Sequence, residues 1–322
     1  AKTRPTRVTA GVTHVALPGV DLLIRPKRSV PLVTVGVYRR RQTAETPERA
    51  GLGALAIRSA ARGTVDLDAR QLARQFERLG GTLGTSVASD WYGVGASVLA
   101  ADYDRAAALL LEVLTRPRFD PAEVEKERGL LLDEAIQTYD DMLRRPMDLA
   151  LGAAFGDRGY GIPVKGVPDS IRALSRDDAE RWHRDELATG RTLVVAVGRL
   201  DPEEAADRLA GVFGDLAAPE AVESAAGATR FVGAETVRIE TRAKSQTGLA
   251  MLFPGPTRRD PDRHAAEVLA AVASGLGGRL FHALRDQRSL AYTVLFSSWQ
   301  RLGAGALLGY IATSPSREEE AR

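Results

Sequence analysis

The sequence predicts a mixed α+β fold built as a tandem repeat of two homologous units. Short runs of alternating apolar and polar residues, typical of strands, are interleaved with helix starts marked by a capping residue and a proline. The pattern of residues 43–61 returns at 257–275, and the LGGT of 79–82 returns as LGGR at 276–279. A pattern that recurs along a chain indicates a duplicated structural unit.

The first unit is expected to alternate strands and helices along its whole length. We expect, in order, strands at 19–25 and 32–38, helices opening at Thr46-Pro47 and Asp68, two strands within 82–99, a helix from Asp102, a long helix from Asp120 to about Arg144, a helix capped by Ser175, a strand at 192–198 and a helix opened by Asp201.

The second unit repeats only the beginning of this order. Residues 217–232 form the best candidate linker, which divides the chain into a first repeat at 1–216 and a second at 233–322. In the second repeat we expect strands at 237–239 and 247–253, a helix opened by Asp260-Pro261, a helix ending near Arg288 and a strand that alternates from Tyr292 through Val294 to Phe296. The second repeat stops at the equivalent of the Asp102 helix, so we expect it to be incomplete by roughly a hundred residues.

The composition excludes several classes of protein. The 322 residues include no cysteine, which excludes disulfide scaffolds, zinc fingers, iron–sulfur proteins and cysteine hydrolases. The four histidines are too far apart in sequence to form a local pair of metal ligands. Lys and Arg number 44 against 42 Asp and Glu, and the basic cluster Arg39-Arg40-Arg41 is short. Nucleic-acid binding usually needs a dense basic face, so we do not expect it.

Nothing in the sequence indicates a membrane protein. No apolar run approaches the roughly 20 residues that a membrane-spanning helix needs. The N-terminus carries no secretory signal pattern, so we expect a cytoplasmic protein, or a periplasmic one if a signal peptide has been removed.

Three segments carry motifs with a chemical meaning. The first is GLGALAIRSAARGT at 51–64, the second is ERGLLLDE at 127–134, and the third is LRDQRSLAYTV at 284–294. Together with the duplication, they resemble the pitrilysin/insulinase family of zinc metallopeptidases, and are most similar to its bacterial and mitochondrial-processing branch. The resemblance implies that each unit is a mostly antiparallel sheet with helices packed on one face, an α/β sandwich.

The resemblance also implies that this chain has lost its zinc site. Active members carry the helical motif H-x-x-E-H, in which two histidines bind zinc and the glutamate activates water. The two histidine positions correspond to Ala54 and Arg58, the glutamate position to Ile57, and the third-ligand position to Glu134. One carboxylate opposite an arginine cannot hold zinc, so we expect no metal on this chain and interpret Glu134 as an ion-pair partner of Arg58.

A second set of family residues is retained. In the family, an arginine and a tyrosine seven residues later bind the substrate and hold its carbonyl oxygen and developing oxyanion. The matching residues are Arg285 and Tyr292. The residues also fit independently, since a guanidinium and a phenol at a helix-to-strand junction could converge on one oxygen. The alternatives are a solvated Arg285 with a core Tyr292, and Arg288 in the role of the arginine.

The predicted function follows from these two sets of residues. We expect a non-catalytic subunit of a heteromeric zinc metallopeptidase, with no activity of its own, that forms half of a peptide-binding chamber. A homologous partner subunit would supply H-x-x-E-H and zinc, and the substrate would be a peptide or unfolded polypeptide. In the family the edge strand of the segment at 79–98 pairs with substrate; an ordinary antiparallel pair is the alternative here. The rival function is a catalytically inert scaffold or peptide-binding protein on the same fold.

Overall fold

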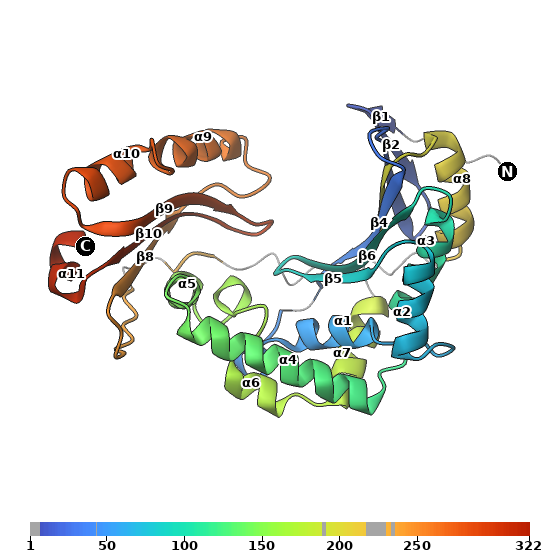
Figure 1. Cartoon of the computed structure of the whole chain (residues 1–322), viewed down its shortest axis with the longest axis horizontal. Helices are drawn as coiled ribbons and strands as arrows, with labels where there is room; N and C mark the ends of the chain where they lie inside the picture. Colours follow the sequence, from blue (N-terminus) through green and yellow to red (C-terminus); the bar gives the residue numbers. More distant parts are fainter. Residues whose placement is uncertain (1–6, 43, 189–190, 217–229, 233–235) are drawn as a thin grey trace. The chain divides into compact units, whose positions relative to one another are not determined.

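The computed structural model describes residues 7–42, 44–188, 191–216, 230–232 and 236–322 (Figure 1). It divides into two compact units, each described separately below. Unit 1 comprises Ala1–Thr43, Gly51–Leu132 and Val164–Ser224, and unit 2 comprises Ala44–Ala50, Asp133–Pro163 and Ala225–Arg322. The division falls within one helix, α4 (Pro121–Asp140). Most of the predicted linker, at 217–229, lies outside the described residues, so the repeat boundaries proposed from the sequence stay a prediction.

Unit 1 contains a seven-stranded, mostly antiparallel sheet. Its strand order is β1-β2-β3-β7-β4-β6-β5, and β3 and β7 form its parallel pair. The strands are β1 (Arg7–Thr9), β2 (Val12–Ala16), β3 (Val20–Pro26), β4 (Leu32–Arg40), β5 (Leu83–Val87), β6 (Trp91–Leu99) and β7 (Thr192–Gly198). The strands predicted at 19–25, 32–38, 82–99 and 192–198 are confirmed.

Helices cover one face of this sheet, as predicted. Helix α3 (Tyr103–Thr115) packs against β4 and β6, and α8 (Pro202–Phe213) packs against β3. Alternate residues of β4, such as Val33 and Val35, are fully buried. On the opposite face, the hydroxyls of Thr34 and Ser97 are exposed and lie 2.7 Å apart. The alternation in β4 therefore reflects one covered and one open face.

The remaining helices of unit 1 begin mostly where the capping residues predict. They are α1 (Leu52–Ala60), α2 (Ala69–Arg78), the start of α4, α6 (Pro168–Ala173) and α7 (Arg176–Ala188). Asp68 and Gln71 form a reciprocal capping box at the start of α2. The start predicted at Thr46-Pro47 is wrong for α1, because Pro47–Arg49 form a separate short 3₁₀ helix. Gly51, at φ 91°, has a left-handed conformation that separates this turn from α1.

The long helix α4 also ends earlier than predicted, at Asp140 rather than near Arg144. The carboxylate of Asp141 accepts hydrogen bonds from the backbone N–H groups of Leu143 and Arg144, both at 2.8 Å. These bonds begin a separate helix, α5 (Arg144–Phe155). A polar side chain that competes for backbone donors is a common cause of such a break.

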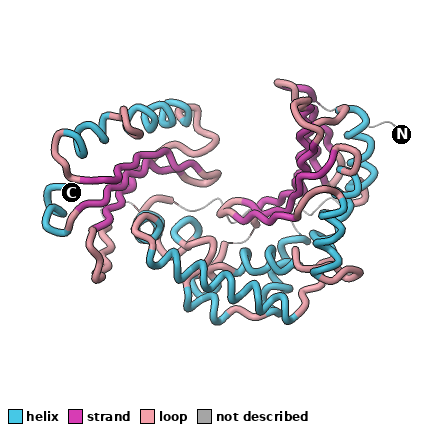
Figure 2. The backbone as a smooth tube through the Cα atoms, viewed as in Figure 1, coloured by secondary structure: helices cyan, strands magenta, loops and turns pink. Residues whose placement is uncertain are grey.

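The sheet of unit 2 repeats part of the sheet of unit 1. Its strands are β8 (Thr247–Pro254), β9 (Ala291–Gln300) and β10 (Gly305–Thr313), in the order β8-β10-β9 (Figure 2). This order matches β4-β6-β5 in unit 1. Two helices, α9 (Arg263–Ala273) and α10 (Arg279–Phe281), lie between the first and second strands along the chain, as α1 and α2 do. A short helix, α11 (Glu318–Ala321), follows β10. The predicted duplication is therefore visible in the topology.

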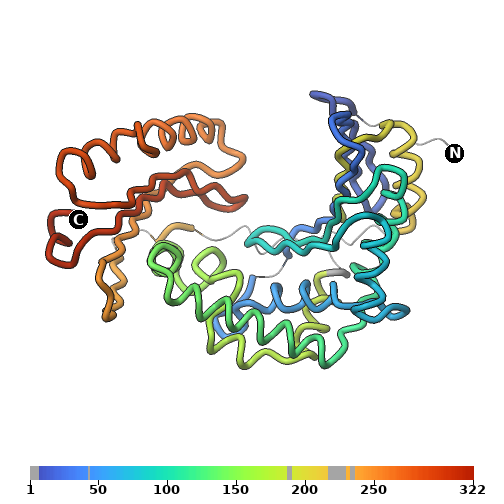
Figure 3. Tube along the Cα trace, viewed as in Figure 1, coloured from blue at the N-terminus to red at the C-terminus, as the bar shows by residue number. Residues whose placement is uncertain are grey.

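Both faces of the unit 2 sheet carry apolar contacts. Leu249 of β8 and, from the segment after α9, Leu280 and Leu284 pack against the same cluster of buried residues around Val294 and Ile311. Leu252, on the opposite face of the same strand, packs in a cluster with Phe155 at the end of α5. In Figure 3 the green trace of α5 lies beside the orange trace of β8, with which it is in contact. Unit 2 thus includes a helix, α5, that precedes the first strand of its sheet by about ninety residues in the chain.

The strand predicted at 237–239 does not form part of either sheet among the described residues. Residues 236–240 have no strand assignment, and Val237 and Ile239 are 70% and 78% exposed. The two-residue period is nevertheless real, because the alternate side chains of Arg238 and Glu240 face the other way, to Asp157 and Arg145. The alternation reflects ion pairing of an extended segment rather than burial in a sheet.

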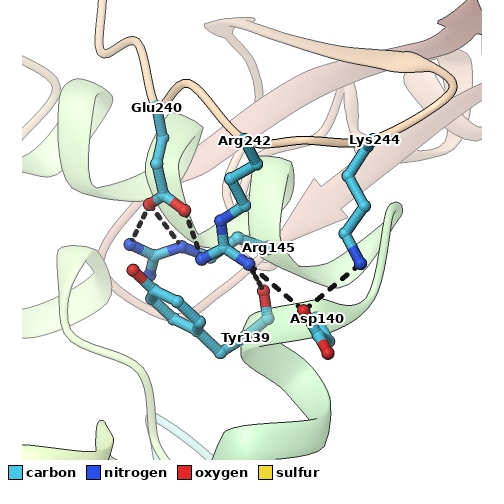
Figure 4. Close-up of polar contacts among 6 residues, drawn as sticks. All are labelled: Tyr139, Asp140, Arg145, Glu240, Arg242 and Lys244. Atoms are coloured by element: carbon cyan, nitrogen blue, oxygen red, sulfur yellow. Dashed lines mark hydrogen bonds and ion pairs between the residues drawn. The ribbon is translucent and has the colours of Figure 1, made fainter.

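Ion pairs continue along the same segment (Figure 4). The guanidinium of Arg242 donates to the backbone carbonyl of Tyr139 and lies 3.6 Å from the centroid of the Tyr139 ring. Lys244 lies 3.3 Å from Asp140, and both arginines, Arg145 and Arg242, pair with Glu240. These contacts hold 238–244 against the end of α4 and the start of α5.

Candidate functional site

The positions that would carry the zinc motif lie on α1 in unit 1. Ala54 and Ile57 are 2% and 1% exposed and belong to the apolar core. Helix α1 packs against α7 and against the sheet edge formed by β5 and β6. Neither side chain has an atom that could bind a metal or activate water. Two of the three motif positions are therefore occupied by buried apolar side chains.

The other two positions do not restore a metal site. Arg58 lies in the last turn of α1 and is partly exposed, and Glu134 lies on the part of α4 that belongs to unit 2. A guanidinium is a cation and does not bind Zn²⁺. Within the described parts of the chain, no three His, Cys, Asp or Glu side chains gather as a metal site requires. The residues at the family's zinc position therefore do not fit zinc, and the predicted pairing of Arg58 with Glu134 stays a prediction.

The structure brings Arg285 and Tyr292 together in unit 2. The Nη1 atom of Arg285 donates to the backbone carbonyl of Tyr292 at 3.2 Å. Its guanidinium carbon lies 4.5 Å from the centroid of the Tyr292 ring, within the range of a cation–π contact. Arg285 is partly exposed and Tyr292 is 76% exposed. The pair therefore lies on the surface of unit 2, with the arginine held against the tyrosine.

Local structure explains why residues seven apart meet. Arg285 lies in a π-helical turn, His282–Asp286, at the end of α10. The chain reverses at Ser289, whose φ is 49°, and then Leu290 is buried at 3% exposure. Arg317 donates to the carbonyls of Arg288 and Ser289 at 2.9 and 2.8 Å, which fixes this corner. A buried leucine and an arginine bonded to two carbonyls together set where β9 begins.

The predicted alternation of Tyr292 with Val294 is wrong. Val294 is 9% exposed, whereas Tyr292 points to solvent. The pairing of β9 with β10 shifts register between Ala312 and Thr313, opposite residues 291–293. A bulge changes which face a side chain occupies, and here it turns Tyr292 out of the sheet's apolar face.

Two neighbouring candidates are not part of the pair. Arg288 is exposed, and no stacking or ion pair is found for it within the described residues. The ring of His282 lies by Asp286, with Nδ1 3.4 Å from a carboxylate oxygen, and by the side chain of Gln287. Of the two arginines considered from the sequence, Arg285 is the one in contact with Tyr292.

The sequence analysis missed a third member of this group. Phe281 is partly buried, and its ring centroid lies 4.8 Å from the guanidinium carbon of Arg285. The signal was present, because residues four apart on a helix are neighbours. We call Phe281, Arg285 and Tyr292 the arginine–aromatic cluster.

Another group was also missed, in the core of unit 1. Arg39 and Arg41, noted in the sequence only as part of a short basic cluster, are 5% and 4% exposed. Arg41 lies over the ring of Trp182, 5.9 Å from its centroid, and the backbone N–H of Gln42 donates to buried Glu186. An arginine run at the end of a strand gives no sequence signal of burial when the acidic residue that acts on it electrostatically, here Glu186 on Arg39, is more than a hundred residues away.

The predicted strand pair at 79–98 is present as β5 and β6, which are antiparallel. On its other side, β5 has no strand partner in the described part of the chain. The edge expected for substrate addition is thus open, and whether it binds a peptide stays a prediction.

Family models match most of the chain. Residues 39–164 match the model described as Insulinase (Peptidase family M16), and residues 173–321 match the model described as Peptidase M16 inactive domain. The chain is 29% identical to an uncharacterized zinc protease of Streptomyces coelicolor over 88% of its own length and 63% of that protein. It is also 29% identical to an uncharacterized zinc protease of Mycobacterium leprae, covering 96% of this chain and 71% of the relative.

Solved structures show the same fold. A protease from Helicobacter pylori matches with a TM-score of 0.85 and 17% identity, over 99% of this chain and 77% of the other. A peptidase M16 inactive domain from Pseudomonas fluorescens matches with a TM-score of 0.79 and 18% identity, over 96% and 76% of the two chains. In the part of the chain that the structure describes, none of the helices is long and apolar enough to cross a membrane.

Proposed function

Because this chain belongs to the insulinase (M16) family of peptidases, we propose that it is a non-catalytic subunit of a heteromeric zinc peptidase and supplies Arg285 and Tyr292 to a partner's active site. The partner would be a homologous subunit that carries H-x-x-E-H and its zinc ion. The chain spans less than two thirds of the length of the Streptomyces relative.

The observation that carries the proposal is the contrast between the two sets of family residues. The zinc positions Ala54 and Ile57 have become buried core, whereas Arg285 and Tyr292 touch each other and Tyr292 is exposed. A protein that kept the fold only as a scaffold has no reason to leave a tyrosine 76% exposed beside a stacked arginine. A substrate-binding pair needs this exposure.

The chemical role follows from the donor groups. Arg285 offers charged N–H donors and Tyr292 a phenolic O–H donor to the oxygen atoms of a bound peptide. Donors held in position before the substrate arrives stabilise negative charge on oxygen without reorganising. The partner's zinc would supply water activation, and this chain would supply binding and charge stabilisation.

The test is reconstitution with a homologous subunit that carries H-x-x-E-H. We expect hydrolysis of a fluorogenic unfolded peptide by the mixture and not by this chain. Tyr292→Phe and Arg285→Ala should each lower the activity of the mixture by about a hundredfold, the usual effect of removing one oxyanion donor. Arg288→Ala is the matched control, because it removes a neighbouring exposed positive charge.

Two results would contradict the proposal. Activity of the partner that does not change on adding this chain would remove the subunit role. Full activity of Arg285→Ala and Tyr292→Phe mixtures would remove the role of the pair. A complex that forms but gains no activity would favour the inert scaffold.

A further inference from the structure

The loop between β3 and β4, residues 27–31, crosses one end of the unit 1 sheet. Gly198, the last residue of β7, lies between the end of β3 and the start of β4. The backbone N–H of Lys27 donates to the carbonyl of Gly198 at 2.6 Å, and the N–H of Ala100 donates to the carbonyl of Pro31 at 3.0 Å. The β3–β4 loop is therefore held against the ends of both β7 and β6.

Apolar side chains are exposed on this loop and beside it. Val30 is 49% exposed, and Leu32, the first residue of β4, is also exposed. Leu99, at the end of β6, is 46% exposed and pairs directly with Leu32 in the sheet. Side chains that face each other across a strand pair are close neighbours. Leu32 and Leu99 thus form a small exposed apolar patch, and Val30 lies two residues away from it in the chain.

Positive charge lies around these apolar side chains. No Asp or Glu occurs at 22–44, so the β3–β4 loop has no acid of its own. Four exposed cations lie on this loop and at the ends of β3 and β7: Arg25, Lys27, Arg28 and Arg199. None of their side chains forms an ion pair or a hydrogen bond with the residues that the structure describes.

The acids that begin the neighbouring helices α3 and α8 do not neutralise these cations. Two of them, at the start of α3, form the ion pairs Asp102–Arg105 and Asp104–Arg208, at 3.3 and 3.2 Å. Asp201 accepts from two backbone N–H groups in the first turn of α8, both at 3.0 Å. Glu203, in the same turn, has no ion pair with the described residues. Four unpaired cations therefore stand against one unpaired acid.

An anionic lipid surface matches this combination of groups. Cations attract the lipid head groups, and exposed apolar side chains next to them enter the boundary between head groups and acyl chains. A specific protein interface needs a larger apolar centre than three side chains provide. We propose that the β3–β4 loop, together with Leu99 and Arg199, is a peripheral docking site for membranes that contain anionic phospholipid. The site goes beyond the proposed peptidase role and does not depend on it.

The test is co-sedimentation of the chain with phospholipid vesicles. Vesicles of phosphatidylcholine are compared with vesicles of phosphatidylcholine and phosphatidylglycerol, at low and at high salt. We expect binding to the mixed vesicles and not to the neutral ones. High salt should weaken this binding, because salt screens the attraction between exposed charges.

Substitutions separate the docking site from general positive charge. Lys27→Ala combined with Arg28→Ala should lower the partition coefficient about thirtyfold, because two cations near the lipid surface are lost. Arg70→Ala combined with Arg74→Ala is the matched control, since both arginines are exposed on α2 and have no ion pair with described residues. It should change partitioning less than about twofold. Val30→Ser should weaken binding about fivefold through lost apolar burial.

The absence of cysteine from the chain provides a second readout. Val30→Cys, labelled with the environment-sensitive fluorophore NBD, should shift its emission to the blue on mixed vesicles, because the label enters an apolar region. Val65→Cys is the matched control at an exposed valine. The backbone N–H of Val65 donates to the carbonyl of Arg116, at the end of α3 that lies away from β6. Its label should show no shift.

Three outcomes would overturn the inference. The first is equal binding to neutral and mixed vesicles, or binding to neither. The second is an equal loss of binding in the two double-alanine variants. The third is binding to soluble polyglutamate as tight as to mixed vesicles with no blue shift at position 30, which would assign the surface to an acidic protein. Circular dichroism checks that each variant is folded, and the labelled Val30→Cys chain tests the site with all four cations in place.

Discussion

Helices α1 and α9 occupy equivalent places in the two repeats but have different surroundings. Helix α1 buries eight of its nine residues, whereas α9 buries only Ala266 and Ala270 of its eleven. Helix α1 packs against α7 and the sheet edge, and α9 packs against β9 and α10. Val268, Leu269 and Val272 of α9 are 47–64% exposed. Related sequences thus specify the same element, and the neighbours decide what that element buries.

The positions assigned to the zinc motif and the arginine–aromatic cluster differ in burial in the same way. The positions assigned to the zinc motif by resemblance lie on a helix that the core of unit 1 encloses, and apolar side chains fill the space there. The arginine–aromatic cluster lies on a surface corner of unit 2, where no packing demand replaces a lost function. The exposure of Tyr292 is what the proposed binding role requires.

The largest expected effect concerns these equivalent helices. Ile57→Glu places a carboxylate in a position that is 1% exposed, and it should lower the free energy of unfolding of unit 1 by more than about 3 kcal/mol. Val268→Glu on α9, where the side chain is 64% exposed, should change the free energy of unfolding of unit 2 by less than about 0.5 kcal/mol. Urea unfolding followed by the fluorescence of Trp91 and Trp182, in a Trp299→Phe background, measures unit 1, and amide hydrogen exchange measures unit 2. Equal effects of the two substitutions would remove the distinction between the helices.

The pH dependence of unit 1 should be the next largest effect. Burial lowers the pKa of His183 from 6.5 to about 4, and the charge of Arg39 acts in the same direction. The unfolded chain therefore binds more protons than the folded one between these values. The free energy of unfolding should fall by up to about 3 kcal/mol as the pH drops from 6.5 to 4. His183→Gln should flatten this dependence, while His264→Gln, at an exposed position on α9, should leave it unchanged.

The contribution of Asp148 to the stability of unit 2 should depend on pH with the opposite sign. Burial raises the pKa of Asp148, on α5, from 3.8 to about 6. Folded unit 2 then binds more protons than the unfolded chain between pH 6 and 3.8, so this group adds stability as the pH falls. Hydrogen exchange at pH 6.5 and pH 4.5, corrected for the intrinsic rate, can compare α7 with α5. Parallel losses of protection in both helices would contradict the predicted difference in sign.

The smallest expected effect lies at two helix starts. The carboxylate of Asp68 accepts from the backbone N–H of Gln71 at 2.8 Å, so Asp68→Ala should destabilise unit 1 by about 1 kcal/mol. Asp262 precedes α9, but its side chain makes no capping bond to the described part of that helix, so Asp262→Ala should cost only a few tenths of a kcal/mol. Thermal unfolding of the two variants checks the difference, and a larger effect of Asp262→Ala would refute it.

Local signals predicted much of the fold. The strands β3, β4, β7 and β8 and the helix starts at Asp68 and Asp201 fall where alternation and capping residues place them. These signals act over a few residues and do not depend on distant neighbours. The errors at α1, at the end of α4 and at 237–239 arose where a left-handed glycine, a competing carboxylate and a set of ion pairs decided the outcome.

For the site, the sequence alone determined which residues to consider. It identified Ala54, Ile57 and Arg58 as positions without zinc ligands, and Arg285 and Tyr292 as a candidate pair seven residues apart. Residue type and spacing suffice for this, because the side chain itself carries the chemistry of a ligand or donor.

Only the tertiary structure decided how these residues are presented. A register shift between β9 and β10 turns Tyr292 outward, and Arg317 fixes the corner of the chain before β9. Phe281 is in contact with Arg285. Burial of Arg39 and Arg41 likewise depended on α7, which lies far along the chain. Exposure and contact depend on which distant segments pack together, and a periodicity of two or four residues carries no information about that choice.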